Sequence, residues 1–269
     1  MKSTIKKLIP FSFAQKLRGI WQRTMSLYYY GHKYECPFCG NTFRKLLPGG
    51  FDLPIIKEKD IIGGGRRANC ICPRCYSTDR DRLILTYLKK SSPIFEQKLK
   101  VLHIAPSGSL KAKLSTQDNL DYQSGVKYHE GFYYSKDISL IDITELSFSD
   151  DTFDVIFCNH VLEHIHDDKK AMSELFRVLK PGGWSILQVP ISNLLDETYE
   201  NSTITDPKER EVHFGQFDHV RIYGKDYVKR LSDVGFRVKE VSPLTEWKDN
   251  NIERYAVNKK EVLFVAYKD

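Results

Sequence analysis

The stretch from residue 153 to residue 190 constrains the fold of this chain more than any other feature. A short apolar run, Asp154–Cys158, has the length of a buried strand and is too short for a core helix. Apolar residues at helical spacing follow it, and Trp184–Val189 is a second apolar run. A strand, a helix and a strand in this order form a βαβ unit, which requires a parallel sheet covered by helices.

The same alternation continues on both sides of this unit. Sharp turns separate the elements, the clearest being Pro181-Gly182-Gly183, where a helix must stop and the chain turn back. The pattern predicts an α/β fold with a Rossmann-like, seven-stranded, mostly parallel sheet, whose ligands bind beyond the carboxyl ends of the strands. The further predicted strands are Val101–Ala105, Tyr122–Val126, Ile138–Ile141, Phe236–Val241 and Val262–Tyr267, and the further helices are Leu110–Leu114 and Asp226–Val234.

The 269 residues divide into four predicted parts. These are a basic amphipathic segment (1–33), a cysteine module (34–78), a connecting helix (79–99) and the α/β domain (100–269). The first 100 residues carry 20 Lys and Arg against 7 Asp and Glu, whereas residues 101–269 carry 21 against 28. Such an asymmetry indicates an anionic surface or an anionic substrate near the N-terminal end, or else a solvated basic face.

Four of the six cysteines form two CxxC pairs separated by 32 residues. Each pair offers two thiolates on one side of a turn, and two such turns complete a tetrahedral Zn²⁺ shell. We therefore expect a structural zinc site in a small zinc-ribbon-like module, with a redox dithiol as the alternative. Cys70 is close enough to be a substitute ligand, and Cys158 is expected in the core. The predicted metal ligands are Cys36, Cys39, Cys72 and Cys75.

Residues 1–30 mix apolar and basic side chains, and Phe13–Tyr29 has the spacing of an amphipathic helix. Its apolar face with Trp21, flanked by Lys and Arg, suits adsorption to an anionic membrane. The alternative is a helix that packs on the catalytic domain or on a partner subunit. No apolar run has the length of a transmembrane span or a signal peptide. We expect a cytoplasmic protein, peripheral at the inner face of the membrane if the helix binds lipid.

Two sequence blocks resemble the central signature of class I S-adenosylmethionine-dependent methyltransferases. They are FDVIFCNHVLEH from Phe153 to His164 and ELFRVLKPGG from Glu174 to Gly183. The resemblance implies the fourth strand of that fold, the helix after it and the turn into the fifth strand. It also implies that Asn159 and His160 lie beside the methionine end of the cofactor.

The cofactor loop departs from the glycine-rich form that the family carries after its first strand. Ala105, Ser107 and Ser109 stand at the glycine places, and the resemblance implies an acidic residue near Val126, for which Glu130 is the nearest substitute. A chain that has become a non-catalytic binding protein with this fold is therefore an alternative. The residues expected to bind the cofactor are His103, Ile104, Ala105, Pro106, Ser107, Asp142, Ile143, Asn159 and His160.

The histidines supply candidates for the chemistry. His160, Glu163 and His164 stand where some quinone-biosynthesis methyltransferases carry a metal set, although a role in starting the next helix is the favoured interpretation. Asp218-His219 follows the fifth strand, where this fold places substrate-facing insertions. A His beside an Asp is a suitable general base for a hydroxyl proton, so His219 and Asp218 are the catalytic candidates. His164 and Arg221 are the predicted substrate contacts, with Arg221 holding an anionic group.

The whole layout resembles bacterial methyltransferases linked with cell-surface polysaccharide synthesis. That resemblance implies O-methylation of a hydroxyl on a sugar, a glycan or a similar small metabolite, with S-adenosylmethionine and structural Zn²⁺ as cofactors. The alternative acceptor is RNA, which the basic residues from 36 to 100 would favour. The acidic body around the site argues against nucleic acid, because it would repel phosphates.

Overall fold

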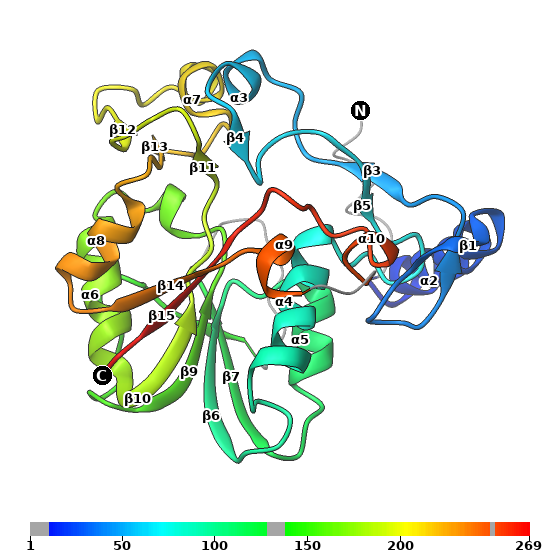
Figure 1. Ribbon diagram of the computed structural model, residues 1–269, viewed down its shortest axis with the longest axis horizontal. Helices are drawn as coiled ribbons and strands as arrows, with labels where there is room; N and C mark the ends of the chain where they lie inside the picture. Colours follow the sequence, from blue (N-terminus) through cyan, green and yellow to red (C-terminus); the bar gives the residue numbers. More distant parts are fainter. Residues whose placement is uncertain (1–10, 128–137, 248–250) are drawn as a thin grey trace.

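The computed structural model describes residues 11–127, 138–247 and 251–269, and places their helices around one central sheet (Figure 1). The sheet has seven strands in the order β14-β15-β10-β9-β6-β7-β8. Six strands are parallel, and β15 runs antiparallel to both of its neighbours. This is the Rossmann-like, mostly parallel sheet that the sequence predicts. The strands are β6 (Leu99–Ile104), β7 (Leu120–Val126), β8 (Ser139–Leu140), β9 (Phe153–Cys158), β10 (Leu179–Ile186), β14 (Arg237–Val241) and β15 (Leu263–Tyr267).

Strand β9 shows why the sheet is buried on both faces. Its side chains alternate, so that Ile156 and Cys158 enter one apolar cluster while Val155 and Phe157 enter the other. The first cluster is closed by α6 (Asp168–Val178) and α8 (Tyr227–Asp233). The second is closed by α4 (Asp79–Ser91) and α5 (Gly108–Leu114). Cys158 is fully buried, which confirms its predicted place in the core.

The turn at Pro181-Gly182-Gly183 lies at the amino end of β10, opposite the ligand edge. Helix α6 ends at Val178, and β10 begins at once with a register irregularity against β9 before Trp184. Gly182 has a φ of +78° and donates its N–H to the carbonyl of Lys268 at 2.7 Å. A Cβ on Gly183 would lie 2.9 Å from the carbonyl oxygen of Asp154, so the turn needs glycine there.

The cysteine module contains two small antiparallel pairs. Strand β1 (Tyr30–Glu35) pairs with β2 (Thr42–Phe43), and β3 (Leu47–Gly49) pairs with β5 (Arg67–Ile71). Helix α2 (Phe11–Tyr28) precedes them and covers the predicted amphipathic segment. It extends beside the module at the edge of the molecule (Figure 1). No described helix has the length and hydrophobicity to cross a bilayer.

The segment between the two CxxC pairs, here called the inter-knuckle segment (residues 40–71), reaches over the ligand edge of the sheet. Its helix α3 (Pro54–Glu58) and strand β4 (Ile61–Ile62) lie against α7 (Pro207–Phe214) and β11 (Ile191–Ser192) (Figure 1). Strands β4 and β11 pair antiparallel, and an apolar cluster joins the two sides. That cluster consists of Ile56, Ile61, Ile204, Phe214 and Ile222.

One further strand pairing and two short helices complete the described chain. Strands β12 (Tyr199–Glu200) and β13 (Arg221–Ile222) pair antiparallel in the insertion after β10. Helices α9 (Pro243–Glu246) and α10 (Asn251–Arg254) follow β14 and precede β15 in the chain. Arg82, fully buried on α4, donates to the carbonyls of Tyr255 and Asn69, and so links the C-terminal segment to the cysteine module.

Candidate active site

A cavity of about 350 Å³ lies between the inter-knuckle segment and the carboxyl edge of the sheet. The inter-knuckle side contributes apolar and glycine residues such as Phe51, Ile61 and Gly63, and α4 contributes Arg80. The α/β domain contributes residues that follow β9 and β10 and the 214–222 loop. The cavity therefore sits where ligands of such sheets bind, beyond the carboxyl ends of the strands.

Unpartnered polar atoms gather at the carboxyl edge of the sheet, in residues that line this cavity (Arg80, His160 and Glu163) or adjoin or contact them. Among the described residues, buried side-chain atoms without a hydrogen-bond partner occur at Arg80, Asn159, His160, Glu163 and Glu261. Glu163 and Glu261 are each only 2 % exposed. Burying a polar group without a partner costs free energy, so such a concentration indicates groups reserved for a ligand.

The strand ends bring these five residues together. Asn159 and His160 directly follow β9, Glu163 lies in the 3₁₀ turn after it, and Glu261 precedes β15. His160 adopts a left-handed φ of +56°, a conformation that non-glycine residues rarely take outside functional sites. Its Nδ1 lies 3.3 Å from Glu163 Oε1 and its Nε2 lies 4.0 Å from Glu261 Oε1. Arg80 Nε lies 3.4 Å from the same oxygen of Glu261.

These contacts set the charges of the group. Burial lowers the pKa of His160, and the nearby charge of Arg80 adds to that effect, so the imidazole is neutral at pH 7. Burial works to raise the pKa of Glu163, but the close contact with His160 at 3.3 Å and the neighbouring histidines outweigh it and lower the pKa to about 2. The cavity wall therefore holds an ionised and buried carboxylate, which attracts cations more strongly than an exposed one does.

The expected pair of Asp218 and His219 is arranged differently from the prediction. Asp218 Oδ2 lies 3.2 Å from Nδ1 of His164, whereas His219 Nδ1 contacts the carbonyl oxygen of Phe214 at 3.3 Å. The rings of His164 and His219 meet edge to face with centroids 4.7 Å apart. The partner of Asp218 is thus a histidine 54 residues away in the chain, which sequence spacing does not reveal.

The surroundings of His164, His219 and Asp218 shift the pKa values of these three residues. Burial works against protonation of His164, but the hydrogen bond to Asp218 and the charge of Glu163 outweigh it and raise its pKa. Burial lowers the pKa of His219. Burial opposes ionisation of Asp218, yet its contacts with His164 and Gln216 lower the pKa to about 2. One histidine therefore favours the charged form and its neighbour the neutral form.

Arg221, a predicted substrate contact, lines the cavity, but its guanidinium is bound within the chain. It is 3 % exposed, and its guanidinium donates to Glu200 and to the carbonyls of Leu162, Ile165 and His166. The donors expected to hold a substrate anion are already used within the chain. They hold the turn that carries Glu163 and His164.

The predicted cofactor loop lies at the adjoining strand end, between β6 and α5. Ala105 has a φ of +45°, so this glycine place does adopt the conformation that favours glycine. The hydroxyls of Ser107 and Ser109 donate to the two carboxylate oxygens of Asp81, at 2.6 and 3.0 Å. Asp81 belongs to α4, so the loop is held by the helix that leaves the cysteine module. The sequence gives no signal for this contact.

The remaining predicted cofactor residues occupy the same edge. His103 is buried beneath the loop and its Nδ1 lies 2.8 Å from the hydroxyl of Tyr122. Asp142 accepts hydrogen bonds from the N–H and hydroxyl of Thr144 and stays exposed, while Ile143 is buried. Pro106 follows Ala105 in the turn, and Ile104 ends β6. Glu130, the expected substitute for the acidic residue after the second strand, lies outside the described residues.

The four predicted cysteine ligands converge. Their sulfur atoms all lie within 4.8 Å of one another, with Cys36 and Cys75 3.5 Å apart and Cys39 and Cys72 3.8 Å apart. A tetrahedron of thiolates around Zn²⁺ has edges of about 3.8 Å, given a Zn–S bond near 2.3 Å. Cys70 lies outside the group: its thiol donates to Asp79 at 3.1 Å, and burial raises its pKa to about 11.

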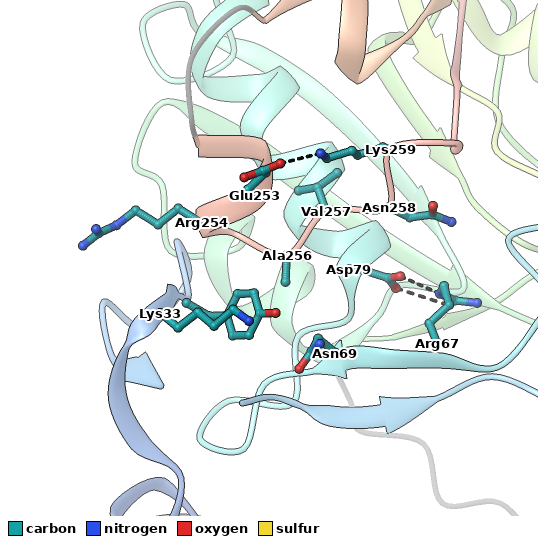
Figure 2. A pocket seen from close by; sticks show the side chains of 11 residues that line it. Lys33, Arg67, Asn69, Asp79, Glu253, Arg254, Ala256, Val257, Asn258 and Lys259 are labelled. Atoms are coloured by element: carbon teal, nitrogen blue, oxygen red, sulfur yellow. Dashed lines mark hydrogen bonds and ion pairs between the residues drawn. The ribbon is translucent and has the colours of Figure 1, made fainter. Parts of the chain in front are cut away.

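A larger depression of about 680 Å³ lies beside the module, between β5 and α10 (Figure 2). Four of its charged side chains form two ion pairs with each other. Arg67 binds Asp79 through two hydrogen bonds, and Lys259 contacts Glu253 at 2.5 Å (Figure 2). The smaller cavity, with its unpartnered buried atoms, is therefore the better candidate for an active site.

Known proteins are similar to this chain in a region that includes Asn159 and His160. Residues 111–187 match a family described as methyltransferase domain. A probable S-adenosylmethionine-dependent methyltransferase of Mycolicibacterium smegmatis is 28 % identical over 122 residues, which are 45 % of this chain and 43 % of that protein. A demethylmenaquinone methyltransferase of Streptomyces avermitilis is 50 % identical over 42 residues, 16 % of this chain and 18 % of the relative. The chain thus spans less than half the length of these relatives.

Solved structures resemble the chain at low sequence identity. A SAM-dependent methyltransferase from Archaeoglobus fulgidus matches with a TM-score of 0.44 and 16 % identity, covering 72 % of this chain and 96 % of that one. A Haemonchus contortus phosphoethanolamine N-methyltransferase 2 matches with a TM-score of 0.46 and 15 % identity, covering 71 % and 53 %. The strand order β14-β15-β10-β9-β6-β7-β8 is that of a Rossmann-like domain, and residues 111–187 within it are similar to methyltransferase domains.

Proposed function

We propose that this protein is an S-adenosylmethionine-dependent methyltransferase that methylates a hydroxyl of a sugar or another small metabolite in glycan biosynthesis. The observation that carries the proposal is the set of unpartnered buried polar atoms at the carboxyl edge of the sheet, where Arg80, His160 and Glu163 line the cavity. The match of residues 111–187 to methyltransferase domains supports the reaction class.

The residues present fit the methionine end of the cofactor. An ammonium group needs acceptors, and Asn159 Oδ1 and Glu261 Oε2 are buried acceptors without a partner in the described chain. Arg80, beside Glu261, offers a positive charge for a carboxylate. Ser107 to Ser109 and Asp142 would hold the rest of the molecule. When bound, S-adenosylmethionine supplies the methyl group on a sulfonium that is a good leaving group.

The cavity suits a small acceptor. Its volume of about 350 Å³ lies at the lower end of the range of ligand pockets, which is roughly 300–1,000 Å³. The inter-knuckle segment excludes water from one side, and polar side chains on the other side orient the acceptor. We propose that His219, which lines the cavity and is 9 % exposed, activates the acceptor hydroxyl.

Two measurements test the proposal. Calorimetric titration should show micromolar binding of S-adenosylmethionine and its demethylated product, and absence of binding would favour a non-catalytic protein. A screen of sugar nucleotides and lipid-linked sugars with methyl-labelled cofactor should then identify the acceptor.

His219→Ala should reduce turnover with that acceptor at least about 100-fold while cofactor affinity stays within a few-fold. Unchanged turnover would reject the role of His219.

We further propose that the Cys36, Cys39, Cys72 and Cys75 cluster holds structural Zn²⁺. Thiolate ligands in a closed tetrahedral set are typical of such sites. The purified protein should contain zinc, and Cys36→Ser should lose it, whereas Cys70→Ala should retain it because Cys70 lies outside the cluster. Zinc content that is the same in Cys36→Ser and in the parent chain would contradict the assignment.

The third proposal is peripheral binding of α2 to an anionic membrane. Among the described residues, α2 leaves Ile20, Trp21 and Leu27 exposed, at 61 %, 48 % and 79 %. Arg18 and Arg23 lie on the same helix. An apolar face flanked by basic side chains favours an anionic lipid surface. The chain should sediment with phosphatidylglycerol vesicles but not with neutral vesicles, and Trp21→Glu with Ile20→Glu should abolish sedimentation. Sedimentation of the double variant equal to that of the parent chain would exclude membrane binding through this face of α2.

A further inference from the structure

We propose that Glu163, His164 and His219 bind a divalent transition-metal ion in the cavity, separately from the cysteine cluster. The ligand atoms of these three side chains all lie within 4.8 Å of one another. All three line the 350 Å³ cavity, and Glu163 Oε2 is buried without a hydrogen-bond partner. The chain thus places one carboxylate and two imidazoles around a single point at the wall of the cavity.

The two ligand segments are held together by the fold itself. The N–H of Val220 donates to the carbonyl of Glu163 at 2.9 Å, so the 3₁₀ turn and the 214–222 loop are joined beside the ligands. Arg221 adds hydrogen bonds to the carbonyls of Leu162 and His166, on either side of Glu163 and His164. The three side chains are therefore held near one another before any ion binds, which reduces the entropic cost of binding.

The second nitrogen of each imidazole has an acceptor of the kind that metal-binding histidines use. His164 Nδ1 faces the Asp218 carboxylate at 3.2 Å, and His219 Nδ1 faces the carbonyl oxygen of Phe214 at 3.3 Å. A ring that donates from Nδ1 to a carboxylate or carbonyl keeps Nε2 as the nitrogen able to bind a metal. Asp218, exposed on its outer side and outside the trio, is then a positioning residue for His164.

The donor set selects the class of ion. Two imidazoles and one carboxylate suit Zn²⁺, Co²⁺, Mn²⁺ or Fe²⁺, whereas Mg²⁺ and Ca²⁺ prefer all-oxygen ligands. Three protein ligands also leave a tetrahedral ion one position open, as in catalytic zinc sites. Since the trio lines the cavity, that position faces the space in which the acceptor binds according to the proposed function, on which this part of the inference rests. His219 would then act on the hydroxyl through the ion.

Cobalt binding to the zinc-loaded full chain tests the site without cofactor or acceptor. Zinc analysis should first show one tightly held ion per chain, in the cysteine cluster. Addition of Co²⁺ should then add one further ion per chain, with visible d–d absorption but without the near-ultraviolet charge-transfer band of thiolate ligands. Mg²⁺ at the same concentration should not displace it. Because the measurement is independent of methyl transfer, its failure and a failure of the proposed activity can be told apart.

Variants give the decisive comparison. Glu163→Gln and His219→Ala should lose the second ion while they keep the zinc of the cysteine cluster, which reports an intact fold. Asp218→Ala should weaken Co²⁺ binding about 10- to 100-fold. His213→Ala, at an exposed histidine of the neighbouring helix α7 that contacts the hydroxyl of Tyr199, is the matched control and should bind normally. A parent chain that binds only one ion, a second ion with thiolate absorption, or a second ion retained by both ligand variants would overturn the proposal.

Discussion

Ala105 adopts a backbone conformation that disfavours a side chain. At a φ of +45° an L-residue is strained, by roughly 1 kcal/mol or more, and glycine relieves the strain while it adds chain entropy to the unfolded state. Ala105→Gly should therefore raise the free energy of unfolding by about 0.5–1 kcal/mol. Ala112→Gly, in the regular helix α5, is the control and should lower it by a similar amount. Urea denaturation checks both, and a loss of stability at residue 105 would contradict the argument.

His103 predicts a pH dependence of stability. Burial lowers its pKa from 6.5 to about 3, so between these values the unfolded chain binds a proton that the folded chain does not. The free energy of unfolding must then fall as the pH is lowered from 6.5, by up to about 1.4 kcal/mol per pH unit from this group. His103→Gln should remove that part of the slope. Denaturation of both chains at pH 7 and pH 5 measures it, and identical slopes would exclude His103.

The sequence could predict site residues where local pattern decides their position. Asn159 and His160 follow a buried strand, and the carboxyl ends of parallel strands meet at one edge. It could not predict their partners, because the contacts of Glu261, Arg80 and Asp218 join segments far apart in the chain. Arg221 shows the same limit. Its burial depends on the carbonyls of a turn that the sequence places nowhere near it.

At the scale of elements, the start of α4 combines two tasks in one side chain. Thr78 and Asp81 form a capping box, in which the threonine hydroxyl accepts from Asp81 N–H and the aspartate accepts from Thr78 N–H. The same carboxylate accepts from Ser107 and Ser109 of the cofactor loop. The helix therefore starts where it also fixes the loop that the cofactor would contact.

Two substitutions separate these tasks. Thr78→Ala removes the cap and one hydrogen bond to the Asp81 carboxylate but leaves both serine contacts, so it should lower the free energy of unfolding by about 1 kcal/mol with little change in S-adenosylmethionine affinity. Asp81→Ala also frees the two serines and should cost about 3 kcal/mol, with at least tenfold weaker cofactor binding. Chemical denaturation and calorimetry give both values. Equal effects of the two variants on affinity would mean that Asp81 does not hold the loop.

Long and regular elements could be predicted from the sequence, whereas short and irregular ones could not. The seven strands of the central sheet and the helices α5, α6 and α8 lie within about five residues of the ranges that periodicity predicts, whereas α7 and the short strands β11, β12 and β13 were not predicted. The inter-knuckle segment carried no such signal, since β4 has two residues and α3 has five. The pairing of β4 with β11 joins Ile62 to Ile191, and no local pattern predicts a contact over that distance.

For the whole molecule, these contacts make the cysteine module part of the active site. The module, α4 and the C-terminal segment meet at Arg82, and the inter-knuckle segment forms one wall of the cavity. The basic N-terminal part and the acidic body are therefore not independent units joined by a linker. We therefore expect changes in the cysteine cluster to alter the wall of the cavity.

Removal of the metal from the cysteine cluster tests this coupling. The proposed metal ion would join the two ends of the inter-knuckle segment. Without it, the β4–β11 pairing, one small apolar cluster and a few hydrogen bonds, such as those of Ser192 to Lys59 and of Arg82 to Asn69, hold the segment in place. Chelation under reducing conditions should therefore speed tryptic cleavage after Lys57, Lys59 and Arg66 at least tenfold, as followed by mass spectrometry.

The matched variants locate the cause of that cleavage. Cys72→Ser should be cut rapidly at these sites without chelator, because it lacks a cluster ligand. Cys70→Ala removes a thiol two residues earlier in the chain that donates to Asp79 instead, so it should be cut slowly until chelator is added. Cleavage that spreads at once over the α/β domain would indicate global unfolding. Cleavage unchanged by chelation would mean that the wall of the cavity is held by its packing against α7 and β11 alone.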